Sequence, residues 1–467
     1  MKRRQILQFL VAVVTAVTVA RGQATTSSQA GLTLQDAVAL ALKNNPAVHA
    51  ADAYADAVRQ SITVAQAARY PRLDFSEGFA RGNNPVYVFG SLLTQRQFTA
   101  RNFDLGLLNA PPPLDNFRTQ FTASMPLFDA GQTGRQVRDA RLDAEGARKG
   151  SERVGQEVIF RVISSYFDEL AARASVRVAE SNVTAITADL ERARARQEQG
   201  LTVPSDVLSV QVQLAQAKED LIRDRNALEI ARAALSVAIG LPEDSYLKIQ
   251  EPLAETTFTA GSLAERQRRA LAIRPDYAEA TLAGERAANG VKTARAEFLP
   301  KINLFSSWEE DNQTFAARGG NNWAAGATLN FNLFDGGANR ARAAESRYRE
   351  RRAEALREQM SAEIKLQVRE AFLNLQAAKE RLDVSRDSAA QAKESLRILR
   401  DRYEAGLVTI VDVLRAEAAT TSAERSHLSA LYDYRIAAAS LELATGELAP
   451  GSNAVVAKAG ALRSGNP

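Results

Sequence analysis

Two short stretches of the sequence carry residues whose types and spacing could do chemistry. Each stretch has a glycine and a leucine, and an aspartate follows six residues after the glycine. A carboxylate just after a glycine turn can cap a new helix, and repeated around an axis by several chains it would form a ring that favours cations. The stretches are RQEQGLTVPSDVL (196–208) and RYEAGLVTIVDVL (402–414), and the shared residues are Gly200, Leu201 and Asp206 in the first and Gly406, Leu407 and Asp412 in the second.

The residue types that support catalysis or metal binding are scarce in this chain. It has no cysteine, and its two histidines are His49 and His427. No glycine-rich phosphate loop, HExxH helix or nucleophile elbow is present, and the acidic residues alternate with Lys and Arg as they do on solvated helix faces. We therefore predict a protein that is not an enzyme and carries no cofactor or metal.

Long helices are predicted to position the two stretches. No proline occurs in 131–200 or in 337–406, and at 1.5 Å per residue each segment would span roughly 100 Å as one helix. The sequence thus predicts two helical hairpins, 131–240 with its tip at 200–206 and 337–446 with its tip at 406–412. The return helices carry heptad seams of the kind found in coiled coils. These seams are Val207, Leu214, Leu221, Leu228 and Leu235 in the first hairpin, and Ala416, Ala423, Ala430, Ala437 and Ala444 in the second.

The chain contains an internal duplication. An offset of 206 aligns PLFDAG with NLFDGG, and an offset of 229 aligns the helix starts Thr33/Asp36 and Ser262/Glu265. The difference of 23 residues falls within 81–115, a segment rich in Pro, Asn and Gly that is predicted to be a long surface loop. We divide the chain into a first repeat 25–240, a linker 241–262, a second repeat 263–447 and a tail 448–467.

The first 24 residues have the pattern of a secretory signal peptide. Lys2-Arg3-Arg4 precede a mostly apolar run, and cleavage after Ala20 or Ala24 fits the small residues that follow. Without this segment, which holds four basic residues, the chain has 55 basic against 55 acidic residues. The balance of charge gives no argument for a nucleic acid partner.

Four segments alternate with a period of two residues and are predicted to be strands: 72–80, 116–128, 301–309 and 323–334. They could be hairpins on a soluble core or membrane strands with a watery inner face. A length of about 9–11 residues, the Asn and Thr on one face, and the export signal favour the membrane. Four strands cannot close a barrel, and open edges are not tolerated in lipid, so several chains must combine. Three chains would supply twelve strands.

The order of these features resembles the TolC family of outer-membrane efflux and secretion channels. The resemblance rests on LTLQDAVALALKNNPAV, the duplication, LFDAG and LFDGG, and the paired GL…DVL breaks, and it covers roughly 31–447. It implies a mainly α fold with a transmembrane β part. A homotrimer would form a twelve-stranded β-barrel in the outer-membrane lipid and a twelve-helix α-barrel in the periplasm, with an equatorial belt that includes 242–262. A periplasmic adaptor would dock on the tips and open them, and an inner-membrane transporter would supply energy.

The resemblance also implies roles for residues at the tips. Tyr403 and Asp206 match positions that link neighbouring tips in the closed state, and Asp412 matches an acidic ring. Two positions depart from the family pattern: Val408 stands in place of an arginine of the lock, and Arg415 stands where a second acidic ring would be, close enough to neutralise the aperture. Both aspartates could instead be helix caps, and Tyr403 an ordinary packing residue. Gly200, Leu201, Gly406 and Leu407 are the predicted docking residues.

A second function from another class fits part of the sequence. A soluble periplasmic adaptor or coiled-coil scaffold would explain the hairpins and the export signal. It would not explain the strands with Asn and Thr on one face.

Overall fold

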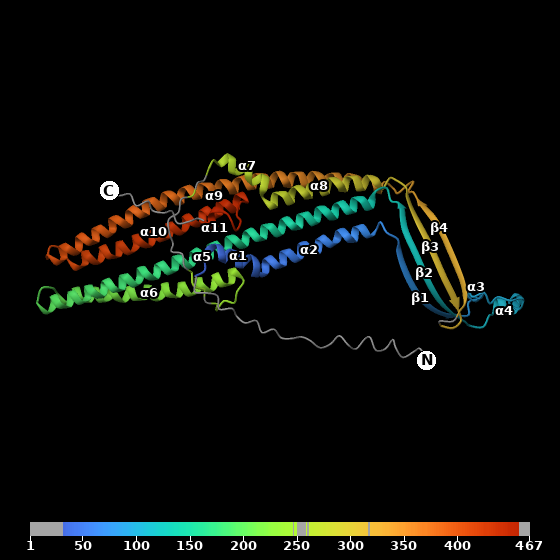
Figure 1. Cartoon of the computed structure of the whole chain (residues 1–467), viewed down its shortest axis with the longest axis horizontal. Coiled ribbons are helices and arrows are strands. Elements are labelled where there is room, and N and C mark those ends of the chain that lie inside the picture. The colour runs from blue at the N-terminus through green and yellow to red at the C-terminus, as the bar shows by residue number, and fades with distance from the viewer. Residues whose placement is uncertain (1–30, 246, 250–257, 259–260, 316–317, 457–467) are drawn as a thin grey trace.

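Two helical hairpins run side by side to one end of the molecule, and a four-stranded sheet lies at the other end (Figure 1). This computed structural model describes residues 31–245, 247–249, 258, 261–315 and 318–456. The hairpins have matched lengths, with 67 residues in each long helix and 36 in each return helix. They consist of α5 (Gln132–Glu198) with α6 (Pro204–Ile239), and α9 (Ala338–Glu404) with α10 (Ile410–Thr445).

Shorter helices flank the halves of the two long helices that are nearer the sheet (Figure 1). They are α1 (Leu34–Asn44), α2 (Pro46–Ala67), α7 (Leu263–Ile273) and α8 (Pro275–Ala296). The helix starts predicted at Thr33/Asp36 and Ser262/Glu265 are confirmed, because the Asp36 amide donates to Thr33 Oγ1 at 3.2 Å and the Glu265 amide donates to Ser262 Oγ at 3.3 Å. Asn45 caps α2 and also donates from Nδ2 to the Ala238 carbonyl at 2.9 Å, which ties the α1–α2 junction to the end of α6.

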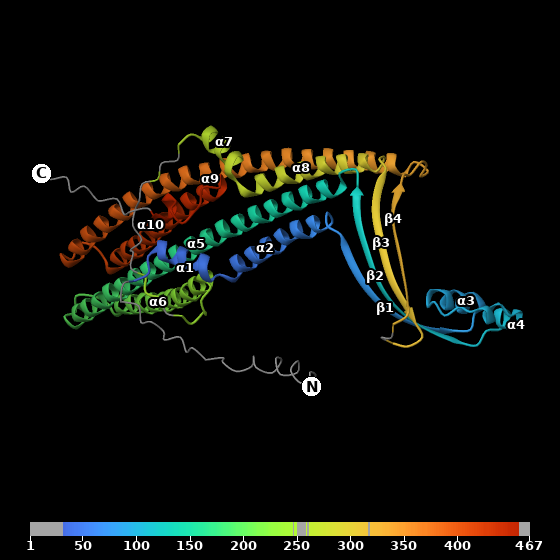
Figure 2. The same ribbon diagram turned by 45° about the vertical axis from the view of Figure 1, so that its right-hand side comes forward.

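The sheet is antiparallel, with the strand order β1-β2-β3-β4. Its strands are β1 (Arg72–Gly82), β2 (Leu114–Phe128), β3 (Lys301–Asn312) and β4 (Gly320–Asn330). Figure 2 shows the sheet beyond the ends of α2, α5 and α8, with β1 and β4 at its two edges.

The two faces of the sheet differ in chemistry. One aromatic row crosses all four strands through the paired residues Phe75, Phe121, Trp308 and Trp323. The Phe75 and Phe121 rings lie 5.2 Å apart between centroids, a contact worth about 0.5–1.5 kcal/mol. The opposite face carries mainly Asp, Ser, Thr, Gln and Asn, so the predicted alternation is confirmed.

The fourth strand does not end where the sequence predicted. We expected 323–334, but β4 runs from Gly320 to Asn330. The last pair is Lys301 with Asn330, and Pro300 precedes that lysine, so the partner strand has run out. Leu333 and Phe334 lie beyond the strand and are exposed.

The segment 81–115 is not the loop that we predicted. It contains α3 (Pro85–Thr94), a 3₁₀ helix η1 (Ala100–Phe103) and α4 (Leu105–Asn109). The helix α3 forms because Asn84 caps it, accepting from the Val86 and Tyr87 amides, and a proline stands at its first position. Gln95 then fastens the segment to the sheet by donating from Nε2 to Asn116 Oδ1 at 2.8 Å.

The apolar core is a series of clusters along the helices. The largest gathers around Tyr166 and Ile163 of α5 and includes Leu34 of α1, Leu235 of α6 and Val455 of the short helix α11 (Asn453–Val456). A separate cluster lies near the hairpin tips. All members of the two predicted heptad seams are buried or half-buried. Each hairpin is therefore held by contacts distributed along its length.

In the described part of the chain, no helix has both the length and the apolar character needed to cross a membrane. The predicted signal peptide, 1–24, lies outside the described residues, as does much of the predicted linker 241–262.

Candidate functional site at the hairpin tips

Both hairpins turn at a left-handed glycine. Gly200 has φ +69° and Gly406 has φ +75°, as predicted for residues that end a helix without a Cβ clash. The Leu201 amide donates to the Arg196 carbonyl at 2.9 Å, and the Leu407 amide donates to the Arg402 carbonyl at the same distance. These bonds satisfy the last carbonyls of α5 and α9 and leave both leucine side chains facing solvent, Leu407 with 68% of its surface exposed.

The second tip starts its return helix with a capping box. Thr409 caps α10, and Asp412 Oδ2 accepts from the Thr409 amide at 3.0 Å and from its hydroxyl at 2.7 Å. The hydrogen bond from the Thr409 side chain lowers the pKa of Asp412, and the nearby charge of Arg415 acts in the same direction. Asp412 is thus a helix cap in the single chain, one of the two roles that the sequence left open.

The first tip is built differently, and here the expected capping role of Asp206 is wrong. The N-cap of α6 is Val203, which has no side-chain acceptor, and the Asp206 carboxylate instead accepts the hydroxyl of Thr202. The proline at the start of α6 already removes one of the amides that would need a cap.

Tyr403 lies between the two hairpins of one chain. Its ring lies 4.8 Å from the guanidinium of Arg196, which also donates to the Tyr403 carbonyl at 3.0 Å. Burial raises the pKa of Tyr403, and its hydroxyl has no hydrogen-bond partner in the described chain. The packing role left open for this tyrosine is therefore present, and a link to a neighbouring tip stays a prediction.

The remaining tip residues divide into exposed and packed groups. Arg415 is exposed beside an apolar groove between α6 and α10, lined by Leu208, Val212 and Val411. Leu414 also borders this groove, but only 9% of its surface is exposed and it packs in the apolar cluster near the tips.

Sequence reasoning missed a buried polar cluster about three turns above the tips. Asp189 of α5 and Glu417 of α10 are 2% and 3% exposed, and Arg400 of α9 pairs with Glu417 and lies 3.9 Å from Asp189. A signal was available, since Glu417 follows Ile410 by seven residues and Val413 by four, which places it on the buried face of its helix.

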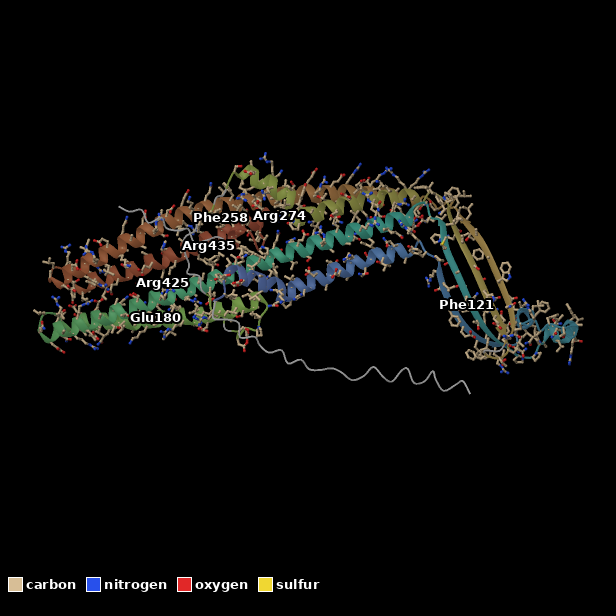
Figure 3. All side chains as sticks on the ribbon, viewed as in Figure 1. Phe121, Glu180, Phe258, Arg274, Arg425 and Arg435 are labelled. Carbon is tan, nitrogen blue, oxygen red and sulfur yellow. The ribbon has the colours of Figure 1, made fainter. Side chains whose placement is uncertain are left out.

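Further contacts join the hairpins above this cluster. Thr421 donates to Asn182 at 3.2 Å, and Arg425 of α10 pairs with Asp224 of α6 at 2.6 Å. Figure 3 shows Arg425 between the two hairpins. Among the residues that the structure describes, no group of three or more His, Cys, Asp or Glu side chains could hold a metal ion.

Long helical hairpins that end in glycine turns, joined to an amphipathic antiparallel sheet, form the architecture of outer-membrane channel proteins. A family model described as outer membrane efflux protein matches residues 37–241 and 267–447. The chain belongs to this family, and it is a channel protein of the outer membrane with a large helical part in the periplasm.

Individual relatives agree with this assignment. The chain is 27% identical over 422 residues to protein CyaE of Bordetella pertussis, covering 89% of this chain and 84% of that one. It is 27% identical over 432 residues to the alkaline protease secretion protein AprF of Pseudomonas aeruginosa, covering 89% and 85%.

Solved structures share the fold. The MtrE outer membrane channel of Neisseria gonorrhoeae, in its open state, superposes with a TM-score of 0.72 at 21% identity and 89% coverage of each chain. VceC of Vibrio cholerae gives a TM-score of 0.71 at 19% identity, covering 88% of this chain and 96% of that one.

Proposed function

We propose that three copies of this chain form one exit duct through the outer membrane and the periplasm. Their sheets would combine into a twelve-stranded barrel in lipid, and their hairpins into a twelve-helix tube built from the two repeats of each chain. The observation that carries this proposal is the state of the sheet in a single chain: among the described residues, β1 pairs only with β2 and β4 only with β3.

The exposed apolar face supports the same assembly. Trp323 is 78% exposed and Phe75 62% exposed, and both belong to the aromatic row that crosses the sheet. In lipid such a face is favourable, but open backbone edges cost several kcal/mol for each unsatisfied group, so the edges must pair with those of sibling chains. The face with Ser, Thr and Asn would then line a watery lumen.

The names of two relatives indicate which partner proteins such a duct would work with. AprF is named for protease secretion and CusC of Escherichia coli for a cation efflux system. A passage of either kind needs a partner that supplies energy at the inner membrane and an adaptor that reaches the channel. We place adaptor docking at Gly200, Leu201, Gly406 and Leu407, and the periplasmic gate at Asp206, Tyr403, Asp412 and Arg415. The adaptor would open the gate by binding the open tips more tightly than the closed ones.

Purification in mild detergent tests this function against the alternative of a soluble periplasmic scaffold. We expect a protein mass about three times the 50.6 kDa of the chain, and ion conductance when the particle is placed in a planar bilayer. We also expect the protein to remain with outer membranes after washing with concentrated salt. A single chain that washes off, needs no detergent and conducts no ions would overturn the proposal.

A further inference from the structure

A buried carboxyl pair joins the two hairpins near their tips. Asp189 extends from α5 and Glu417 from α10, and the same guanidinium nitrogen of Arg400 lies 3.9 Å from the Asp189 carboxylate and 2.5 Å from that of Glu417. Both side chains are at least 97% buried within the single chain. The pair therefore sits at an interface that must be disturbed if one hairpin moves away from the other.

Two arginines contact the pair, but both are partly exposed to solvent whereas the two carboxyls are buried. Arg400, from α9, bonds to Glu417 and lies 3.9 Å from Asp189. Arg192, one turn along α5, pairs with Asp189 but is partly exposed to solvent. One oxygen of each carboxyl, Asp189 Oδ2 and Glu417 Oε2, has no hydrogen-bond partner in the described chain. A proton on the Glu417 carboxyl would remove one of the two buried negative charges.

Several other charged groups lie near the pair. Lys393, Glu404 and Glu424 line the same cavity as Glu417 and Arg400. On α9, Arg397 pairs with Glu394 and Asp401. The α6 residue that reaches α10 higher up, Asp224, pairs with Arg425. Arg196 of α5 is stacked on Tyr403. The groups that act on the Glu417 carboxyl are thus Asp189 from α5 and Arg400 from α9.

We propose that Glu417, buried beside Asp189, is a pH-sensitive latch that holds the two hairpins of one subunit together while its carboxyl keeps a proton. Loss of that proton would leave two like charges buried at the same interface, and the α5–α10 contact would loosen. The latch is a property of the single subunit. Its consequence for channel opening rests on the function proposed above.

The direction of the pH effect follows from the environment of Glu417. Burial and the neighbouring Asp189 raise the pKa of Glu417 to about 8, against an ordinary value of 4.5, while Arg400 opposes the rise. Separated hairpins would expose the carboxyl, which would then lose its proton at the ordinary pKa. The closed interface is therefore most stable at low pH, and its stabilisation is lost as the pH rises through about 8. Between these two pKa values, the ratio of open to closed hairpins should rise up to about tenfold per pH unit.

A single engineered thiol can measure this ratio. The chain has no cysteine, and Ala193 lies one turn beyond Asp189 on the same face of α5 with none of its surface exposed. In Ala193→Cys, a methanethiosulfonate reagent can react only when the interface opens. Dividing the labelling rate by that of a free thiol at each pH corrects for ionisation of the thiol. We expect the corrected rate to rise with pH and to level off above about pH 8.

Two further variants show which groups cause the slope. Glu417→Gln keeps the size of the side chain but cannot ionise, so it should label at a rate that is independent of pH. Asp189→Asn removes the second carboxyl but leaves Glu417 buried, so it should keep a pH dependence, reduced and shifted to lower pH. Asp401→Asn, which removes an exposed carboxylate of α9 paired with Arg397, should keep the parent slope. The melting temperature of each variant, measured at pH 6, shows that it has folded.

The latch is overturned if Ala193→Cys labels with no pH dependence or not at all, or if Glu417→Gln keeps the parent slope. Mass in detergent and bilayer conductance are recorded on the same samples. A conducting trimer without the slope would refute the latch alone. A slope in a protein that neither assembles nor conducts would refute the channel function alone.

Discussion

Ala324 and Ala325 are adjacent on β4, exposed in the single chain, and on opposite faces of the sheet. Ala325 is the middle residue of the strand and lies opposite Ser306 on the face that carries the aromatic row. Ala324 lies opposite Ser307 on the polar face. If the proposed barrel forms, Ala325→Arg places a guanidinium in hydrocarbon, and Ala324→Arg places the same group in water.

The cost of the two substitutions should differ greatly. An arginine on the lipid face near the membrane centre costs about 2–4 kcal/mol, so three copies would cost about 6–12 kcal/mol per trimer. On the lumen face the expected cost is close to zero. We expect Ala325→Arg to be lost from the outer-membrane fraction and Ala324→Arg to insert with altered conductance or ion selectivity. Fractionation with salt washing, followed by bilayer recording, measures both. Equal insertion of the two variants, or failure of Ala324→Arg alone, would refute the assignment of the faces.

Three further substitutions, two of them with a control, test the hairpin tips and the junction between α1 and α2. Gly406→Pro should reduce export to background while the outer-membrane level of the protein stays normal, because proline cannot adopt φ +75° or donate the 2.9 Å bond to the Tyr403 carbonyl; normal export would contradict the placement of the tip. Leu407→Asp should weaken capture of the adaptor without changing the melting temperature, whereas Leu414→Asp, at a position 9% exposed, should lower that temperature. Asn45→Ala should lower the free energy of unfolding by about 1–3 kcal/mol through loss of a cap and a buried hydrogen bond, and the exposed control Asn109→Ala should change it by under about 0.5 kcal/mol; similar values in urea titrations would show that the buried bond contributes nothing.

Much of this architecture could be predicted from the sequence because its signals are local or periodic. Proline-free segments, heptad seams and glycine turns are features of a single helix or a single connection. They predicted the ends of the hairpin helices to within a few residues. Strand ends were harder to predict because a strand continues only while its partner does. The fourth strand was expected to reach residue 334, and it ends at Asn330 because the chain before Lys301 turns away at Pro300. In the segment 81–115, the overall richness in Pro and Asn concealed the Asn84-Pro85 start of α3.

The tip residues illustrate a different limit. Asp206 and Asp412 occupy equivalent positions in the two repeats, yet only Asp412 forms a capping box, because Thr409 offers a hydroxyl where the first repeat has Val203. The role of an aspartate at a helix start thus depends on a neighbour three residues away. Tyr403 shows the same dependence across elements, since its ring packs against Arg196 of the other hairpin.

The carboxyl pair needs three helices in a particular register, which no pattern within one helix can give. Helical spacing predicts that Asp189 and Glu417 face the interior. Whether the two residues lie at the same level depends on the register in which α5 and α10 pack. The duplication adds a test of this reasoning: an offset of 206 aligns Glu417 with Gln211 and Asp189 with Ser395, neither of which can ionise in the physiological range. The first repeat therefore already carries the neutral amide that Glu417→Gln would introduce into the second. If protonation of Glu417 governs separation of the hairpins, pH sensitivity should reside at the α5–α10 contact. It should be absent from any contact that Gln211 and Ser395 make in the assembled tube.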